Sequence, residues 1–365
     1  MASIVTVVKK PFSLCISITK WIPVVFILAV VGWSYYAYVV ELCMVTVESY
    51  AEKLVYLVFY HISLLLFLWS YYQTVMTPIG KVPKQFKLSS ADLERFESTE
   101  DNRLQIQILD RHAADGCLPT YNRTMSGTLR YCERCRQIKP DRCHHCSVCG
   151  ECVLKMDHHC PWVNNCIGFT NYKFFVLFLG YAFTYCVYVT LSTLKYFIVF
   201  WKDGLQGVAR FHILFLFFVA SMFGVSLISL LSYHCYLVLR NQSTLETFRP
   251  PIFESGPDKR GFHMGRYNNF CEVFGDSKLK WFLPVFSSLG DGVSFPQRHV
   301  DLDSDGLLGR QRWQERLLSD DASDSDDSHA ALVSGLAGDG GVRVGNGVPV
   351  GSPQRSVPDV RLVME

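Results

Sequence analysis

The stretch CERCRQIKPDRCHHCSVCGECVLKMDHHCPWVNNC, residues 132–166, concentrates cysteine and histidine as no other part of the chain does. Eight cysteines and four histidines fall within its 35 residues, and several of the cysteines are separated by two residues. Structural zinc sites take four cysteine or histidine ligands, and C-x2-C pairs are a common ligand spacing. The segment therefore predicts metal binding.

The candidate ligands outnumber the places of two closed zinc sites by one. Cys160 is the residue left over, and it lies beside Asp157 and a pair of histidines. A cysteine without a metal, next to a histidine, is a candidate nucleophile. The alternative makes Cys160 a ninth candidate ligand, and counting alone leaves both open. The eight other candidates are Cys132, Cys135, His145, Cys146, Cys149, Cys152, Cys166 and one of His158 and His159.

Four apolar runs flank this segment, two on each side. They cover about residues 21–40, 54–75, 174–201 and 213–239, and each reaches the roughly 20 residues that a helix needs to cross a bilayer. Aromatic residues near their ends, such as Trp21, Trp69 and Trp201, favour membrane spans over buried helices of a soluble core. We therefore expect an all-α polytopic protein in a lipid bilayer. The net charge of +2 gives no field that would attract nucleic acid.

Basic residues predict the orientation of the chain. They are numerous in residues 77–173 and sparse in the connections 41–53 and 202–212. The positive-inside rule then places the cysteine-rich segment and both termini in the cytosol, where thiols stay reduced. The expected organisation is an N-terminal part with two spans (1–76), a cytosolic domain (77–173) containing the zinc domain (about 130–170), two more spans (174–239), a cytosolic C-terminal domain (240–299) and a disordered tail (300–365).

Two features of the soluble parts are predicted locally. Residues 88–113 favour one exposed helix with Ser89 or Ser90 as its N-cap. Residues 240–299 mix aromatic residues, glycine and proline, and we expect them to fold back on the cysteine-rich domain and the membrane interface. The tail contains an acidic dileucine pattern at residues 303–308, and Ser323 precedes an acidic run that suits a kinase.

The chain resembles the DHHC protein S-acyltransferases, or palmitoyltransferases, over about residues 10–300. The resemblance is carried by Asp157-His158-His159-Cys160-Pro161-Trp162 and by the cysteine spacing before it. After the fourth run, Ser243-Thr244-Leu245-Glu246 is similar to the TTxE motif of the family, with serine in the first place. Asn269, ahead of Val273-Phe274-Gly275, matches a C-terminal motif. The resemblance implies structural roles for Thr244, Glu246 and Asn269.

The resemblance implies an interleaved assignment of two structural zinc ions. One would be held by Cys132, Cys135, His145 and Cys152, and the other by Cys146, Cys149, His159 and Cys166. Cys143 and His144 fall outside both sets and are interpreted as ordinary packing or surface residues.

The implied reaction transfers a palmitoyl group from palmitoyl-CoA to other proteins. His158 would take the proton of Cys160, with Asp157 orienting the imidazole. Cys160 would then attack the thioester of the acyl-CoA, and a membrane-proximal cytosolic cysteine of a substrate protein would attack the acyl-enzyme in turn. The resemblance implies Golgi, endosomal or plasma membrane as the location.

The acyl chain and the CoA need their own contacts. Ser34 and Tyr185 reach a similar depth in their spans, and a hydrogen bond between them that closes the acyl pocket is one hypothesis; two unrelated packing contacts are the alternative. Further candidates along the acyl chain are Trp162, Phe174, Phe175 and Leu231. Basic candidates for the CoA phosphates are Lys139, Arg142 and Lys173.

Two other classes of protein compete with the enzyme. A membrane-anchored zinc adaptor or ubiquitin ligase would use the zinc domain alone, but it does not account for Cys160 or for the Asp-His-His-Cys run. A channel or transporter would need ionisable residues along its spans, and only His61, Lys195 and His234 stand out there.

Overall fold

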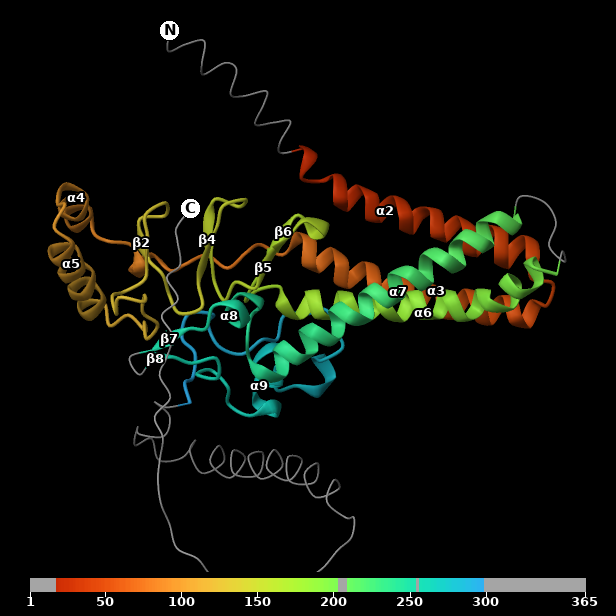
Figure 1. Cartoon of the computed structure of the whole chain (residues 1–365). Helices are drawn as coiled ribbons and strands as arrows, with labels where there is room; N and C mark the ends of the chain where they lie inside the picture. Colours follow the sequence, from red (N-terminus) through yellow and green to blue (C-terminus); the bar gives the residue numbers. More distant parts are fainter. Residues whose placement is uncertain (1–17, 203–208, 254–255, 299–365) are drawn as a thin grey trace, which may run out of the picture. The chain divides into compact units, whose positions relative to one another are not determined.

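Four long helical segments carry the apolar runs of the chain (Figure 1). Each is long and apolar enough to cross a membrane. Large apolar side chains on their outer faces, such as Leu65 and Val225, are exposed, as expected for contact with lipid. The segments are α2 (Ile22–Tyr35) continued by the π-helix η1 (Tyr36–Thr46), α3 (Tyr50–Met76), α6 (Tyr172–Phe200) and α7 (Ala209–Arg240). This confirms the predicted multi-pass helical membrane protein.

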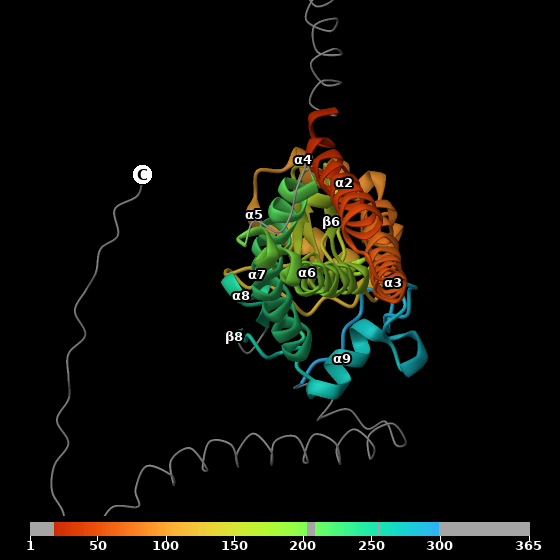
Figure 2. The same cartoon turned by 90° about the vertical axis from the view of Figure 1, so that its right-hand side faces the viewer.

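Helix α6 is the most buried of the four spans. It packs along both α3 and α7, and η1 packs against α7 (Figure 2). Tyr185 and Val189 of α6 belong to the same buried cluster as Tyr38 of η1 and Tyr60 of α3. The helices thus share one apolar core, which reaches as far as Cys160.

The first span is longer than predicted. It continues through η1 to Thr46, so the connection to α3 shrinks from the expected residues 41–53 to residues 47–49. Leu42 and Cys43 of η1 are fully buried, which explains why the helix continues past Glu41. Ser49 then starts α3 as its N-cap, with its side chain accepting a hydrogen bond from the Glu52 N–H.

The computed structural model describes residues 18–202, 209–253 and 256–298, and these all lie within one unit, Met1–Leu317. The dileucine pattern and Ser323 of the predicted tail fall outside the described residues.

The segment predicted as one helix over residues 88–113 forms two helices, α4 (Ser90–Ser98) and α5 (Asn102–Asp115). Ser89 caps α4, as one of the two expected caps. The single-helix prediction was wrong because Asp101 starts a new helix by accepting a hydrogen bond from the Arg103 N–H. An ion pair of 2.7 Å between Arg111 and Asp92 ties the two helices together.

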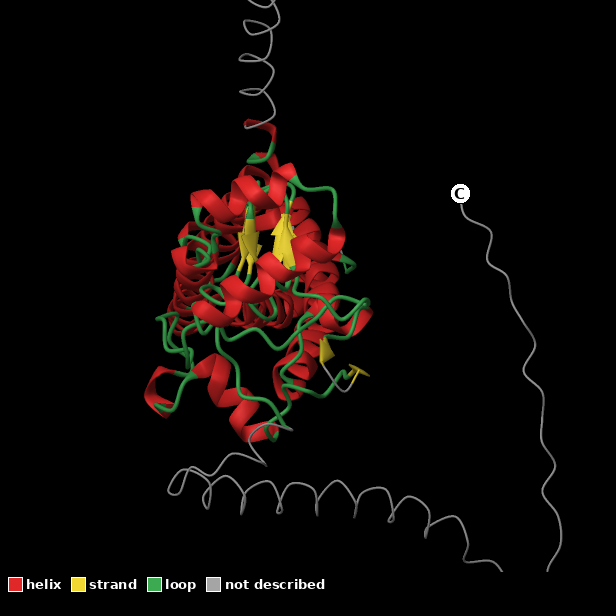
Figure 3. Cartoon of the chain, turned by 90° about the vertical axis from the view of Figure 1, so that its left-hand side faces the viewer, coloured by secondary structure: helices red, strands yellow, loops and turns green. Residues whose placement is uncertain are grey.

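The cysteine-rich segment, which lies between α3 and α6 in the chain, folds into three short antiparallel hairpins. Figure 3 draws strands in yellow. The strands are β1 (Tyr131–Cys132), β2 (Gln137–Ile138), β3 (His144–Cys146), β4 (Glu151–Val153), β5 (His158–Cys160) and β6 (Asn165–Ile167). Cross-strand register places His145 opposite Cys152 and His159 opposite Cys166. The 3-10 helices η2 (Lys84–Phe86) and η3 (Pro161–Val163) precede β1 and follow β5.

Asn165 joins the zinc domain to the end of the second span. Its side-chain Nδ2 donates to the carbonyl oxygens of Thr74, Val75 and Thr77, at 3.2, 3.2 and 2.9 Å. These carbonyls end α3 and have no partner within the helix. The side chain of Asn171 donates to Thr74 as well. The third hairpin therefore caps α3 directly.

The chain after α7 folds back on the cysteine-rich segment. Asn269 is fully buried, donates to the Leu239 carbonyl at the end of α7 and accepts from the Met264 N–H. Ser243 caps α8 in a capping box with Glu246, so serine fulfils the first place of the motif with its hydroxyl. The elements here are α8 (Thr244–Phe248), β7 (Ile252–Phe253), β8 (Gly256–Pro257), α9 (Arg266–Phe274) and η4 (Lys278–Lys280).

Arg142 is the centre of the contact between the cysteine-rich segment and the chain that follows α7. Its guanidinium forms a bidentate pair with Glu246, at 2.7 and 2.8 Å, and donates twice to Asn241. Phe262 and Phe295 cover it at 4.6 and 5.0 Å. Burial alone would lower the pKa of Arg142, but Glu246 and Glu272 outweigh burial and raise it. The two carboxylates therefore keep the buried guanidinium of Arg142 charged.

Replacing Arg142 with methionine is expected to destabilise the protein by about 3–5 kcal/mol, because it leaves the buried carboxylate of Glu246 without its partner. Thermal unfolding of purified protein, followed with a thiol-reactive dye, measures this. Arg136→Met is the matched control: its ion pair with Glu97 is largely exposed, and losing it should cost less than about 1 kcal/mol. Equal shifts in the two variants would contradict the prediction.

Candidate active site and metal centres

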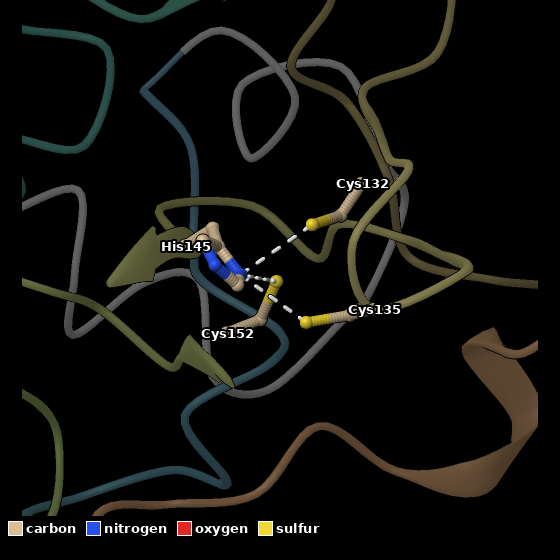
Figure 4. Close-up of side chains that lie close together, drawn as sticks. All are labelled: Cys132, Cys135, His145 and Cys152. Atoms are coloured by element: carbon tan, nitrogen blue, oxygen red, sulfur yellow. Dashed lines mark hydrogen bonds between the residues drawn. The ribbon is translucent and has the colours of Figure 1, made fainter. Parts of the chain in front are cut away.

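The first metal centre lies between the first two hairpins. Cys132 ends β1 and Cys135 lies in the turn that follows, and His145 and Cys152 face each other across β3–β4. Figure 4 shows the three sulfur atoms around Nδ1 of His145. The distances from this nitrogen are 3.6 Å to Cys132, 3.2 Å to Cys135 and 4.0 Å to Cys152.

The second centre repeats this arrangement one hairpin further along. Cys146 ends β3 and Cys149 lies in the turn that follows, and His159 and Cys166 face each other across β5–β6. The three sulfur atoms lie 3.7, 3.5 and 3.5 Å from Nδ1 of His159. The structure thus brings together the two interleaved quartets that the family resemblance implies.

Both quartets fit a tetrahedral zinc ion. With Zn–S about 2.3 Å and Zn–N about 2.05 Å, a tetrahedron places nitrogen and sulfur about 3.6 Å apart. The observed separations of 3.2–4.0 Å bracket this value. Each centre has four protein ligands, so zinc here would be structural and without an open coordination position.

Cys160 belongs to neither quartet among the described residues. It ends β5, one residue after the ligand His159, and is 7% exposed. Cys160 also belongs to the apolar cluster of the spans, together with Phe175 and Tyr185. The thiol is therefore placed where the zinc domain meets the membrane helices.

Asp157 and His158 form a short hydrogen bond beside this thiol. The distance between Asp157 Oδ2 and His158 Nδ1 is 2.6 Å. Asp157 is almost completely buried, whereas the side chain of His158 is partly exposed. With Nδ1–H donated to the carboxylate, Nε2 is the nitrogen left to exchange a proton with a thiol.

Thr244 completes the surroundings of Asp157. Its backbone N–H donates to Oδ1 at 2.8 Å, and its hydroxyl donates to Oδ2 at 2.9 Å. Glu246, two residues later, pairs with Arg142. The Thr244–Glu246 segment therefore orients the aspartate on one side and anchors the C-terminal domain on the other.

The charged forms of Asp157 and His158 stabilise each other. Burial disfavours the charged form of His158, but the Asp157 carboxylate and the Cys160 thiol outweigh burial and raise the pKa of His158 to about 9. Burial also disfavours the Asp157 carboxylate, but His158, His234 and the Thr244 N–H outweigh it and lower the pKa of Asp157. The imidazole can thus hold a proton beside an ionised carboxylate.

Ser34 and Tyr185 meet in the interior of the spans. The Ser34 and Tyr185 hydroxyls are hydrogen-bonded, and Tyr60 adds a third hydroxyl 2.8 Å from that of Tyr185. Tyr60 was not predicted, because a tyrosine in an apolar run gives no sign of which helix it faces. The aromatic rings of Phe67, Tyr71 and Phe178 join Tyr185 and Cys160 in one buried cluster.

The other residues predicted to contact the acyl chain differ in how deeply they are buried. Phe175 is buried against the rings of His158 and His234. Leu231 packs partly buried against the apolar cluster that contains Cys160. Phe174 is buried, and Trp162 is half exposed, with its ring 6.3 Å from that of Phe26.

The structure does not support the CoA-binding prediction for Arg142 and Lys173. Arg142 is buried by the contacts described above. Lys173 is also buried, and its Nζ donates to the carbonyls of Lys280 and Val285 and to the Ser287 hydroxyl. Both charges are engaged inside the fold and not offered to a phosphate. Lys139, half-buried just after β2, stays a candidate.

Comparison with known proteins places the site in a family. A family model described as DHHC palmitoyltransferase matches residues 125–250. The protein named palmitoyltransferase ZDHHC2 of Danio rerio is 57% identical over 290 residues, which cover 79% of this chain and 80% of that protein. The chain belongs to the DHHC palmitoyltransferase family. Palmitoyltransferase ZDHHC15 of Homo sapiens is 50% identical over 321 residues, covering 87% of this chain and 94% of that protein.

As a DHHC palmitoyltransferase, the chain is a protein S-acyltransferase with metal-binding clusters between its second and third spans. The comparisons give no support to the alternative of a zinc adaptor or ubiquitin ligase. The fold and the family agree on an enzyme that acts at a membrane.

Proposed function

We propose that Cys160 carries the palmitoyl group and that His158 and Asp157 serve it as base and orienting carboxylate. The observation that supports this most is a buried thiol outside both metal quartets, beside a histidine whose other nitrogen is bound to an aspartate. Two zinc ions would hold the hairpins in place and take no part in the chemistry.

The first half of the reaction loads the enzyme. The Cys160 S–H proton passes to Nε2 of His158, and the thiolate attacks the carbonyl carbon of the palmitoyl-CoA thioester. A new thioester forms on Cys160, the bond to the CoA sulfur breaks, and the CoA thiolate takes the proton from His158. Asp157 stabilises the imidazolium in between.

The second half of the reaction transfers the palmitoyl group from Cys160 to a substrate protein. A cysteine of a substrate protein gives its proton to His158 and attacks the acyl-enzyme, and Cys160 leaves with the proton restored. One thioester replaces another in each half, so no ATP is required. Because Cys160 lies among the ends of the spans, substrate cysteines close to the cytosolic membrane face fit best. Golgi, endosomal and plasma membranes remain the proposed locations.

The test is labelling of the purified full chain with a palmitoyl-CoA analogue that carries a clickable tag. Wild type should acquire a hydroxylamine-labile label, and Cys160→Ser should acquire none while keeping two zinc ions per chain. Label that persists in Cys160→Ser would overturn the assignment of the nucleophile. Loss of zinc in that variant would make Cys160 a metal ligand instead.

We further propose that the acyl chain runs from Cys160 to the hydroxyls of Ser34 and Tyr185. Tyr185 lies 13 residues into α6 from Tyr172, about 20 Å along a helix, roughly the length of an extended sixteen-carbon chain. The buried rings of Phe67, Tyr71 and Phe178 supply an apolar path between the two ends.

Replacing Ser34 with phenylalanine should shorten this path by about two methylene groups. At about 0.8 kcal/mol per methylene, the preference for a C14 over a C16 acyl-CoA should rise by roughly ten-fold. Competition labelling with acyl-CoAs of different length measures this ratio. Ser229→Phe, on an exposed face of α7, is the control and should leave the ratio unchanged. An unchanged ratio in Ser34→Phe would place the acyl chain elsewhere.

A further inference from the structure

A second buried histidine lies against the catalytic pair, on a different helix. His234 is in the last two turns of α7 and is 2% exposed. One ring nitrogen of His234, one of His158 and one carboxylate oxygen of Asp157 all lie within 4.8 Å of one another. The reaction scheme above does not use this histidine.

The ring of His234 has a fixed orientation. Its Nδ1 is 3.1 Å from the hydroxyl of Tyr172, the first residue of α6, and both residues are buried. If the tyrosine donates this hydrogen bond, the proton of the imidazole resides on Nε2. A tyrosine hydroxyl on one helix thus restrains the rotation of a histidine ring on the next.

Two rings, those of Phe175 and His234, pack against His158 from the side of the helices. Phe175 meets the rings of His158 and His234 edge-on, with centroids 5.3 and 5.0 Å apart. The centroids of His158 and His234 are 5.8 Å apart, with the rings tilted by 38°. Asp157 holds one edge of His158 through a hydrogen bond, and the rings of Phe175 and His234 pack against the imidazole and restrict its rotation.

We infer that His234, held by Tyr172, is a positioning residue that fixes the ring plane of His158 so that Nε2 faces the Cys160 thiol. His234 contacts neither the thiol nor the acyl group in this role and acts through His158. The same geometry would make the catalytic centre sensitive to the packing of α6 against α7. This inference rests on the proposed roles of Cys160 and His158.

The experiment measures single-turnover acylation of Cys160 by palmitoyl-CoA in the full chain, purified in detergent. His234→Leu should lower the rate constant at saturating palmitoyl-CoA by about 10- to 100-fold, the range expected for a misaligned catalytic group. The KM for palmitoyl-CoA should stay within about two-fold, since ground-state binding is untouched. The zinc content should stay at two per chain.

Two further variants separate positioning from general packing. His234→Gln can keep a hydrogen bond with Tyr172 and should recover most of the rate. Tyr172→Phe should lower the rate by about three- to ten-fold, the value of one hydrogen bond. The double variant Tyr172→Phe/His234→Leu should be no slower than His234→Leu alone, because both act through one ring.

The matched control is His212→Leu on the same helix. His212 also bonds a neighbouring span, accepting from Trp33 Nε1, but it lies 22 residues from His234, about 33 Å along a helix. It should leave the acylation rate within two-fold. A similar loss of rate in both histidine variants, or multiplicative effects of Tyr172→Phe and His234→Leu, would overturn the inference.

The outcomes distinguish this inference from the proposed function. If wild type is not acylated on Cys160, the proposed function fails, and the inference fails with it. If wild type is acylated and His234→Leu reacts at the wild-type rate, only the inference fails. If His234→Leu loses zinc, its acylation rate no longer tests the positioning role, and the rates of Tyr172→Phe and His234→Gln are used instead. A wild-type acylation rate in Tyr172→Phe would then overturn the positioning role.

Discussion

Asp157→Asn is expected to reduce acylation of Cys160 by about 10³- to 10⁴-fold, the size of effect seen when a triad loses its carboxylate. Oδ2 of Asp157 accepts hydrogen bonds from both His158 Nδ1 and the Thr244 hydroxyl, and Oδ1 accepts from the Thr244 N–H. An asparagine has one oxygen and one NH2 group, so an N–H donor would face at least one of these donors. The imidazole would then favour the tautomer with its proton on Nε2, which cannot take the proton of the thiol.

Single-turnover labelling with palmitoyl-CoA measures this loss, and the zinc content should stay unchanged. Asp141→Asn is a matched control, because Asp141 is another buried carboxylate that accepts from backbone N–H groups, those of Tyr121 and Asn122. Its loss should affect unfolding temperature but change the rate by less than about three-fold. Asp157→Asn with more than a tenth of the wild-type rate would contradict the role of the carboxylate.

Removing zinc is expected to unfold the hairpins and abolish acyl transfer. The hairpins β1–β2, β3–β4 and β5–β6 have only two or three residues per strand, too few to be stable alone. A structural zinc contributes about 10–16 kcal/mol to folding, as much as the whole stability of an ordinary domain. Cys146→Ala should therefore leave at most one zinc per chain and no detectable label on Cys160.

The control for this experiment is Cys143→Ala. Cys143 is fully buried near the first quartet but belongs to neither set, so this variant should keep two zinc ions and most of its activity. Metal content is measured by mass spectrometry, and folding by circular dichroism before and after a chelator. Two zinc ions in Cys146→Ala, or a lost zinc in Cys143→Ala, would show that the ligand sets are assigned wrongly.

Much of the architecture was predictable because its causes are local. Runs of about 20 apolar residues have few alternatives to a membrane span, and ligand chemistry limits how cysteines and histidines can be used. The ends of the elements depended on contacts that composition does not reveal. The first span continues past Glu41 because Leu42 and Cys43 are buried, and Asp101 divides the helix predicted over residues 88–113.

The roles of individual polar residues were harder to predict, since their partners are distant in the sequence. Arg142 and Lys173 resembled exposed basic residues, but Glu246 and the carbonyls of residues 280 and 285 hold them inside. His234 was only a rare ionisable residue in an apolar run. Its place beside Asp157 depends on how α6 and α7 pack, which a single sequence does not show.

The hydrogen bonds from Asn165 to the carbonyls that end α3 have a consequence for protein engineering. They make the border between membrane helix and zinc domain a joint structure, to which both sides contribute backbone or side-chain atoms. A chimera that exchanged only the cysteine-rich segment between relatives would separate the amide from the helix end that it caps. Cutting within α3, so that residues 74–77 travel with the hairpins, would keep this joint intact.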